Sequence, residues 1–209
     1  MDGIPFCQVS ETHLEQASRN RSRFPTLKIA WCVLRLFPGI TRDMQMAAFD
    51  FAFQNWCDVS QLTHRNIADP RELLEDEALV LIDSRRIDGP GMVLAESELA
   101  DGTLRPVRQW YDSERFVLTD RPTGNQIDLG AVACHELGHA VGISHLSTGA
   151  LMAPHYVPGL RTPQREDIEE IQVRYGKPSP SAPPPAGGLP SVTVLEIDWG
   201  ARVVREKNR

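Results

Sequence analysis

The sequence is short of basic residues and of long apolar runs. It has 22 Lys and Arg against 28 Asp and Glu, a formal net charge of −6. Phosphate binding needs a basic face, so we expect no nucleic acid as the main partner. No apolar run is long enough to cross a bilayer, so we also expect no membrane span. With 209 residues, 41% of them hydrophobic, the chain is typical of one globular domain with tails.

The start of the chain lacks the basic and apolar regions of a signal peptide. Either the protein stays inside the cell, or a secretion signal has been removed. The four cysteines, Cys7, Cys32, Cys57 and Cys134, lack C-x-x-C spacing. Their even number allows two disulfides, and scattered thiols suit a reducing compartment equally well. Cysteine usage therefore leaves compartment and pairing open.

Composition divides the chain into four parts. Residues 1–24 are polar and end in arginines, so we expect a loosely ordered leader. One folded domain is expected over residues 25–177, followed by a proline-rich, extended linker over 178–190. The tail, 191–209, holds one expected strand and is too short to fold alone. It either docks on the main domain or is the stub of something longer.

Within residues 25–177 the apolar patterns alternate between strand and helix. Strands are expected over 26–37, 78–84 and 91–99, from period-two or continuous apolar runs. Helices are expected after a Thr41 cap, over 127–142, and from Thr162–Pro163 to a stop at Gly176. The pattern predicts an α/β (α+β) domain.

Half of the six histidines lie in the stretch HELGHAVGISH, residues 135–145. On a helix, His135 and His139 leave the same face one turn apart. Gly142 can take the left-handed conformation that ends a helix, so the chain can turn and bring back His145. Three imidazoles leave one position of a tetrahedral zinc for water, which is typical of a catalytic site. We therefore predict one zinc ion here.

The chemistry follows from the neighbouring glutamate. Zinc lowers the pKa of a bound water from about 16 toward about 7. Glu136 then accepts the water proton and passes it to the leaving amine. The alternative is a helix with unrelated surface histidines. The full H-E-x-x-H-x-x-G-x-x-H pattern arises by chance in roughly one chain in tens of thousands, so we interpret it as a metal site.

These residues, with Met152 in ALMAP, resemble the zinc motif and methionine turn of the metzincins, and among them the matrixins. The resemblance implies a metzincin/zincin-like catalytic domain, with a twisted, mostly parallel five-stranded sheet, three helices and a zinc cleft. It implies a zinc-dependent metalloendopeptidase that is a monomer and acts outside the cell, on the extracellular matrix. Substrates would be extended polypeptides that add a strand beside residues 92–97.

The same resemblance suggests substrate-binding residues. DGPGMVLAESEL is similar to the matrixin edge strand, which places Val93, Leu94 and Ala95 beside substrate. MAPHYVPG is similar to the wall of the pocket for the residue after the scissile bond (the S1′ pocket for P1′). Pocket lining is therefore expected from Pro154, His155, Tyr156 and Ala131. Ala131 lies one turn before His135, where a small side chain implies a deep pocket for an apolar P1′ residue such as Leu or longer.

Three departures from the family pattern bear on metals and latency. Glu96 and Trp110 occupy positions where matrixins hold a structural zinc, so we expect none. Calcium could be held by Asp88, the Gly89 and Gly91 carbonyls, Asp112 and Glu114, or these could be ordinary loop acids. Cys7 lies where matrixin leaders carry an inhibitory cysteine, but the usual flanking arginine and aspartate are missing. It is either a latency residue or a plain thiol.

Two other functions remain open at this point. One is a metzincin-type hydrolase with a narrow substrate. The other is a zinc-loaded module that binds peptides without turnover. Glu136 argues against the binding module, because a protein without catalysis has no need of a carboxylate there.

Overall fold

The computed structural model describes residues 5–9, 22–88, 93–113, 118–119, 122–123, 126–179, 194–198 and 203–207. The chain divides into two compact units, Met1–Ser179 and Pro180–Arg209. The second unit holds an antiparallel pair, β9 (Val194–Asp198) and β10 (Val203–Lys207). The boundary falls inside the expected linker, and the tail has two strands where the sequence predicts one.

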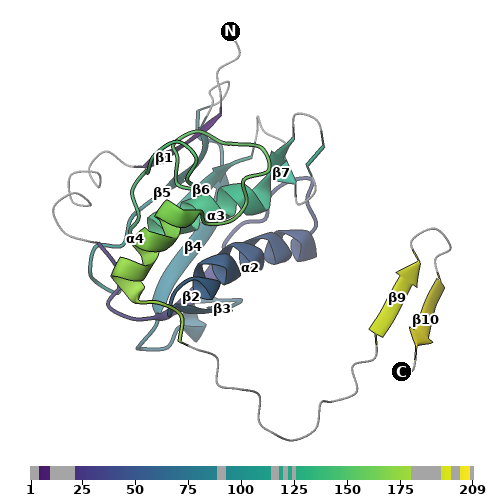
Figure 1. Cartoon of the computed structure of the whole chain (residues 1–209), viewed down its shortest axis with the longest axis horizontal. Coiled ribbons are helices and arrows are strands. Elements are labelled where there is room, and N and C mark those ends of the chain that lie inside the picture. Colours follow the sequence, from purple (N-terminus) through teal and green to yellow (C-terminus); the bar gives the residue numbers. More distant parts are fainter. Residues whose placement is uncertain are drawn as a thin grey trace, which may run out of the picture. The chain divides into compact units, whose positions relative to one another are not determined.

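The main sheet has six strands in the order β1-β5-β6-β4-β2-β3 (Figure 1). All neighbours are parallel except β5 and β6. The strands are β1 (Phe6–Val9), β2 (Lys28–Val33), β3 (Thr63–Asn66), β4 (Ala78–Arg85), β5 (Val93–Ser97) and β6 (Val107–Asp112). The mostly parallel α/β fold is thus confirmed, and five of the strands belong to the domain itself.

The sixth strand, β1, comes from the leader. A loosely ordered leader was expected, and for residues 6–9 this prediction is wrong. The physical reason is that β5 offers a free main-chain edge, and hydrogen bonding to such an edge does not depend on the side chains of the added strand. Phe6, Cys7 and Val9 are moreover apolar, so this short part of the polar leader can form a strand there.

Three α-helices and one 3₁₀ turn lie in the part of the first unit that the structure describes. They are α2 (Arg42–Asp58), η1 (Pro70–Glu72), α3 (Leu129–Ala140) and α4 (Arg165–Tyr175). As expected, Thr41 caps α2 by accepting a hydrogen bond from the Met44 amide. The predicted start of α4 at Thr162–Pro163 is wrong. The helix begins at Arg165, because Gln164 and Asp167 form its capping box.

α3 begins at Leu129, two residues later than predicted. Ile127 and Asp128 instead form β8, which pairs with β7 (Leu118–Thr119). Asp128 then serves as the N-cap of α3, and its side chain accepts hydrogen bonds from the amides of Gly130 and Ala131. Residues 135–140 of the histidine-rich stretch therefore lie in the C-terminal half of a capped helix, and the rest of the stretch follows the helix.

An aromatic core joins the sheet to α2 and α3, which pack together on one of its faces (Figure 1). Trp31 of β2 stacks on Phe53 of α2 with ring centroids 5.1 Å apart. Trp56 is fully buried and donates its indole N–H to the Cys134 carbonyl over 2.8 Å. Burying each such side chain contributes about 1.5–3 kcal/mol, and the Trp56 bond fixes α3 against α2.

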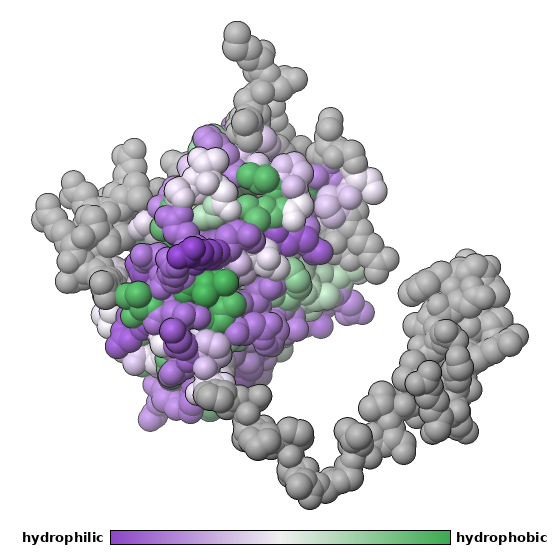
Figure 2. Space-filling model, in the orientation of Figure 1, coloured by the Kyte–Doolittle hydropathy of each residue, from purple (hydrophilic) through white to green (hydrophobic). Residues whose placement is uncertain are grey.

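The surface is mostly hydrophilic, with small separate apolar areas on the face shown in Figure 2. The exposed large hydrophobic side chains are Leu27, Leu34, Leu36, Met44, Leu74, Leu104, Val157 and Val173. Among the described residues, none of the helices has the length and apolar character to cross a bilayer. All four cysteines are free thiols.

Candidate active site

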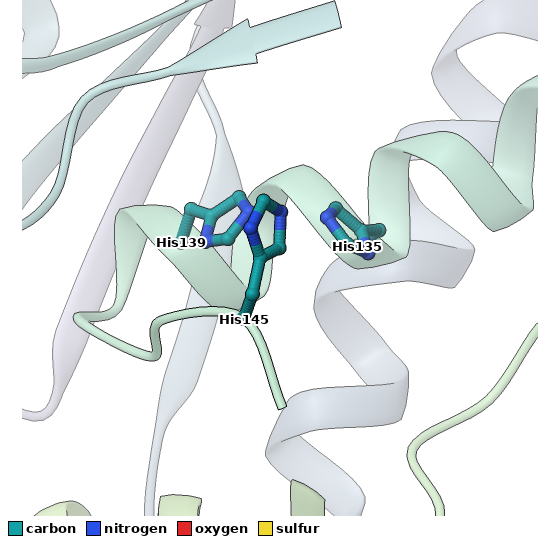
Figure 3. Close-up of side chains that lie close together, drawn as sticks. All are labelled: His135, His139 and His145. Carbon is teal, nitrogen blue, oxygen red and sulfur yellow. The ribbon is translucent and has the colours of Figure 1, made fainter. Parts of the chain in front are cut away.

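Three histidines converge at the end of α3. His135 and His139 project from the helix, and His145 comes from the loop that follows it (Figure 3). Their ring centroids are 4.7, 4.8 and 5.5 Å apart. One nitrogen from each ring lies within 4.8 Å of the others, close enough for all three to approach a single ion.

Gly142 provides the turn that returns the chain to the site. Its φ is +92°, the left-handed region in which side chains are strained. A Cβ at this position would also lie 1.9 Å from the Ser22 carbonyl oxygen. Glycine is therefore required twice, by the backbone conformation and by the close approach of the irregular segment before β2, and the position of His145 depends on this turn.

Hydrogen bonds to main-chain carbonyls fix two of the imidazole rings. His135 Nδ1 lies 2.7 Å from the Leu151 oxygen, and His139 Nδ1 lies 2.7 Å from the Ile143 oxygen. A carbonyl can only accept, so both Nδ1 atoms carry the proton and both Nε2 atoms keep a lone pair. Burial lowers the pKa of His135 to about 4 and also holds the pKa of His139 well below its ordinary value. Both rings are therefore neutral at pH 7, as metal ligands must be.

The free ring nitrogens show that this donor set fits zinc. The Nε2 atoms of His135, His139 and His145 are buried and have no hydrogen-bond partner among the described residues. Buried polar atoms without a partner are rare and costly. Three neutral imidazole nitrogens that face one point satisfy a tetrahedral zinc while leaving its fourth position open.

Glu136 lies beside these nitrogens and is fully buried. Neither of its carboxylate oxygens has a hydrogen-bond partner among the described residues. Burial raises the pKa of Glu136 to about 8, and the neighbouring Cys7 thiol opposes that rise. A carboxyl group without partners next to a metal-binding cluster is typical of a general base.

Met152 lies beneath the site, against α3. It is fully buried, and a Cβ on Gly138 would lie 2.2 Å from its sulfur atom. The glycine therefore lets the methionine turn approach the helix closely. The preceding residue, Leu151, supplies the carbonyl that orients His135. The turn thus acts on the site through its main chain as well as through its sulfur atom.

Asp167 holds that turn, and the sequence analysis missed it. Its fully buried carboxylate accepts hydrogen bonds from the amides of Leu151 (2.7 Å), Met152 (3.0 Å) and Gln164 (2.7 Å). Asp167 therefore supports His135 through Leu151. The only sequence signal was an acid in the first turn of the last helix, which is common in any helix.

The leader strand β1 lies in the cleft beside the site. It pairs with β5, with Cys7 opposite Ala95. On its other side the Cys7 amide donates to the Pro154 oxygen over 3.2 Å, and the Tyr156 amide donates to the Pro5 oxygen over 3.0 Å. The buried Cys7 sulfur lies within 4.8 Å of ligand atoms of His135 and Glu136. Residues 5–9 therefore fill the space between the cleft walls.

A small cavity of about 20 Å³ lies next to Cys7 and His135. Its lining includes three residues expected from the sequence, Ala131, His155 and Tyr156, together with Val157 and Leu160. Pro154 instead contacts Cys7 through its main-chain oxygen. Val93, Leu94 and Ala95 lie on β5, with β1 along their edge.

The expected calcium ligands are only partly described. Gly89, Gly91 and Glu114 lie outside the described residues. Asp88 accepts a hydrogen bond from the Val93 amide, and its other carboxylate oxygen is buried without a partner among the described residues. Asp112 is fully buried at the end of β6. The calcium site stays a prediction.

At the positions where the sequence predicts no structural zinc, Arg85 contacts both Glu96 and Trp110. Glu96 and Trp110 face each other on β5 and β6. Arg85 of β4 pairs with Glu96 over 2.6 Å, and its guanidinium lies 4.4 Å from the Trp110 ring centroid. The cluster adds side-chain contacts to the main-chain pairing of the three strands. The absence of a second zinc stays a prediction.

Comparison with known proteins identifies similar sequences. A family model described as Matrixin matches residues 22–176. Interstitial collagenase from Sus scrofa is 29% identical over 193 residues, 88% of this chain and 39% of that protein. Matrix metalloproteinase-19 from Homo sapiens is 34% identical over 185 residues, with coverages of 84% and 34%. Stromelysin-1 from Rattus norvegicus is 31% identical, with coverages of 73% and 33%. The chain thus spans about a third to two fifths of the length of these relatives.

Proposed function

From its membership in the matrixin family we propose that this chain is a zinc-dependent endopeptidase. The observation that carries the proposal is the set of three unpartnered Nε2 atoms, from His135, His139 and His145, with the unpartnered Glu136 carboxylate beside them. A peptide-hydrolysing zinc site needs this combination of neutral ligands and a nearby base.

Each residue of the site has a distinct role. When bound, zinc supplies a water of lowered pKa and polarises the scissile carbonyl. The three histidines hold the ion through Nε2. Glu136 accepts the proton of the attacking water and delivers it to the leaving nitrogen. The Leu151 and Ile143 carbonyls keep His135 and His139 in the tautomer that binds metal.

Substrates are proposed to be polypeptides in extended conformation. The edge of β5 at Val93–Ala95, which β1 occupies in this structure, offers its main-chain groups to a substrate strand once β1 has left it. The cavity lined by Ala131, Tyr156 and Leu160 has mostly apolar walls, and an apolar P1′ side chain gains free energy by leaving water there. We therefore propose cleavage on the N-terminal side of Leu or a longer apolar residue.

A quenched fluorescent peptide series with different P1′ residues tests this function. We expect hydrolysis by the chain carrying Cys7→Ser, loss of hydrolysis with a chelator, and recovery on adding zinc. Adding Glu136→Ala to this chain should retain zinc and abolish hydrolysis. Equal signals from the Cys7→Ser chain with and without Glu136→Ala would instead indicate the peptide-binding module, and a preference for Ala or Gly at P1′ would contradict the deep pocket.

We also propose that residues 5–9 keep the enzyme latent. The observation that favours this role is the position of β1, which is hydrogen-bonded to β5 on one side and to Pro154 and Tyr156 on the other. The flanking arginine and aspartate expected of such a leader are missing. Main-chain pairing and the edge-on contact of Phe6 with His155, with ring centroids 6.3 Å apart, hold the strand instead. Cys7 then brings its sulfur to the histidine cluster.

Latency is tested by the full chain with Cys7→Ser. We expect this variant to cleave peptide faster than wild type, because serine is a much weaker zinc ligand than a thiolate. Cys57→Ser is the matched control, since Cys57 lies on α2 and away from the cleft lining. Equal rates for Cys7→Ser and wild type would show that Cys7 is a plain thiol.

A further inference from the structure

The segment that walls the pocket, residues 153–164, is fastened to the first turn of α3 at one residue, Asp128. The Asp128 carboxylate caps the helix and is 2% exposed. Arg161 Nε lies 2.6 Å from its Oδ2 atom. The main-chain amide of Asp128 also donates to the Tyr156 hydroxyl over 3.2 Å. Two residues of the wall therefore meet the same point of the catalytic helix.

Arg161 is held on a second side by α2. Its guanidinium lies 4.7 Å from the ring centroid of Phe51, a cation–π contact. Arg161 thus connects the pocket wall to both helices beneath it.

Gly130 makes room for this arrangement. A Cβ on Gly130 would lie 3.1 Å from Arg161 Nη2, 3.3 Å from Asp128 Oδ1 and 3.3 Å from the Phe51 ring. Glycine in a helix costs about 1 kcal/mol relative to alanine, and this one lies in the first turn of the helix that carries the zinc ligands. The space it leaves is filled by the Arg161 guanidinium.

We propose that Arg161 is a positioning residue that sets the depth of the P1′ pocket by holding residues 153–164 against Asp128. This inference rests on the proposed peptidase function and names the source of its P1′ selectivity. Leu160, next to Arg161 in the chain, lines the cavity together with Tyr156 and Val157, and on α3 the cavity is lined by Ala131. Tyr156 and Leu160 also pack against the core, whereas Val157 is exposed, and the ion pair of Arg161 with Asp128 ties the wall to α3.

Loss of the ion pair should therefore widen the pocket rather than disable the site. The zinc ligands are oriented by Leu151 and Ile143, which Arg161 does not contact. A wider pocket favours bulky P1′ side chains over Leu, since the fit of a side chain in a pocket changes relative rates by about tenfold or more.

The test uses the full chain carrying Cys7→Ser, with kcat/KM measured for peptides that differ only in Leu or Trp at P1′. The leader competes equally with both peptides, so the ratio is unaffected by it. Arg161→Met should raise the Trp-to-Leu ratio about tenfold. Asp128→Asn, which keeps an N-cap oxygen but removes the charge, should raise it similarly, and the double variant no further.

Two variants separate positioning from general destabilisation. Arg161→Lys restores a positive charge and should return the ratio part of the way to wild type. Arg165→Met, at an exposed arginine paired with Glu169, should leave the ratio unchanged. A ratio for Arg161→Met within twofold of wild type would overturn the proposal, as would an equal change in Arg165→Met.

A binding measurement tests the pocket proposal without requiring hydrolysis. Fluorescence anisotropy of the same two peptides on zinc-loaded protein with Glu136→Ala gives a ratio of Kd values without hydrolysis. If the Cys7→Ser chain hydrolyses nothing, the peptidase function fails, and the Kd ratios with and without Arg161→Met still decide the pocket proposal. An unchanged Kd ratio overturns it, and an increase in relative Trp affinity supports it.

Discussion

Glu136 and Asp167 are both buried carboxylates near the methionine turn, but they differ in their hydrogen bonding. Glu136 faces the cleft, and its oxygens have no hydrogen-bond partner among the described residues. Asp167 lies on the other side of Leu151 and Met152, and its carboxylate accepts three main-chain amides. Both are completely buried.

The contrast distinguishes structural from reactive polar groups. A buried carboxylate with its hydrogen bonds made stabilises the fold, whereas one without partners costs stability and is retained only for another purpose. The same difference separates the Nδ1 and Nε2 atoms of His135, of which one is bonded to Leu151 and the other has no partner. The side of the cluster that faces the cleft is unsatisfied, and the side that faces the core is satisfied.

The largest expected effect on activity comes from changing the group that faces the cleft, Glu136. Glu136→Gln should lower kcat/KM by about a thousandfold, the range of general acid–base catalysis. Because burial disfavours the charged carboxylate and the Cys7 thiol offsets only part of that cost, the free energy of unfolding should not fall. Peptide hydrolysis and urea denaturation on the same preparations measure both quantities. A marked loss of stability would show that Glu136 is also structural.

The opposite result is expected for Asp167. Asp167→Ala removes the acceptor of three amides, two of them in the methionine turn, and should lower the free energy of unfolding by about 3 kcal/mol. Asp167→Asn keeps one carbonyl oxygen and should cost less. Urea denaturation measures the difference, and a destabilisation below that of Glu136→Gln would remove the contrast between the two carboxylates.

Metal addition should satisfy the unpartnered nitrogens and so stabilise the fold. Zinc at a free concentration of 100 times its Kd raises the free energy of unfolding by about 2.7 kcal/mol. His139→Ala should abolish this gain, whereas Asp167→Asn should retain it. Thermal unfolding with zinc or chelator measures the gain. Elemental analysis should give one zinc per chain, and two would mean that a second site was missed.

The smallest effect is expected on the outer face of the sheet. Arg85 pairs with Glu96 and lies over Trp110, but its side chain is 41% exposed. Exposed ion pairs contribute about 0–1 kcal/mol, so Arg85→Met should lower the free energy of unfolding by no more than this. A loss as large as that of Asp167→Ala would show that the cluster holds β5 as firmly as buried hydrogen bonds hold the methionine turn.

The sequence predicted the parts of the site that depend on local spacing. His135 and His139 are one helical turn apart, and Gly142 has the positive φ expected of it. The structure accordingly brings the three rings together. The start of α4 was predicted less well, because both Thr162–Pro163 and Gln164 are compatible with the start of a helix. The hydrogen bond from the Gln164 amide to the Asp167 carboxylate accompanies the observed start at Arg165.

The zinc motif, the helix that carries it and the α/β class were determined by the sequence alone, since each follows from residues within one or two turns of one another. The tertiary structure decided which strand covers the β5 edge, what Asp167 supports and where Arg161 binds. Main-chain edges and carboxylates accept any donor of suitable geometry. Interacting pairs such as Cys7 and Ala95, or Arg161 and Asp128, therefore produce no periodic pattern in the sequence. They are identified only in the folded structure.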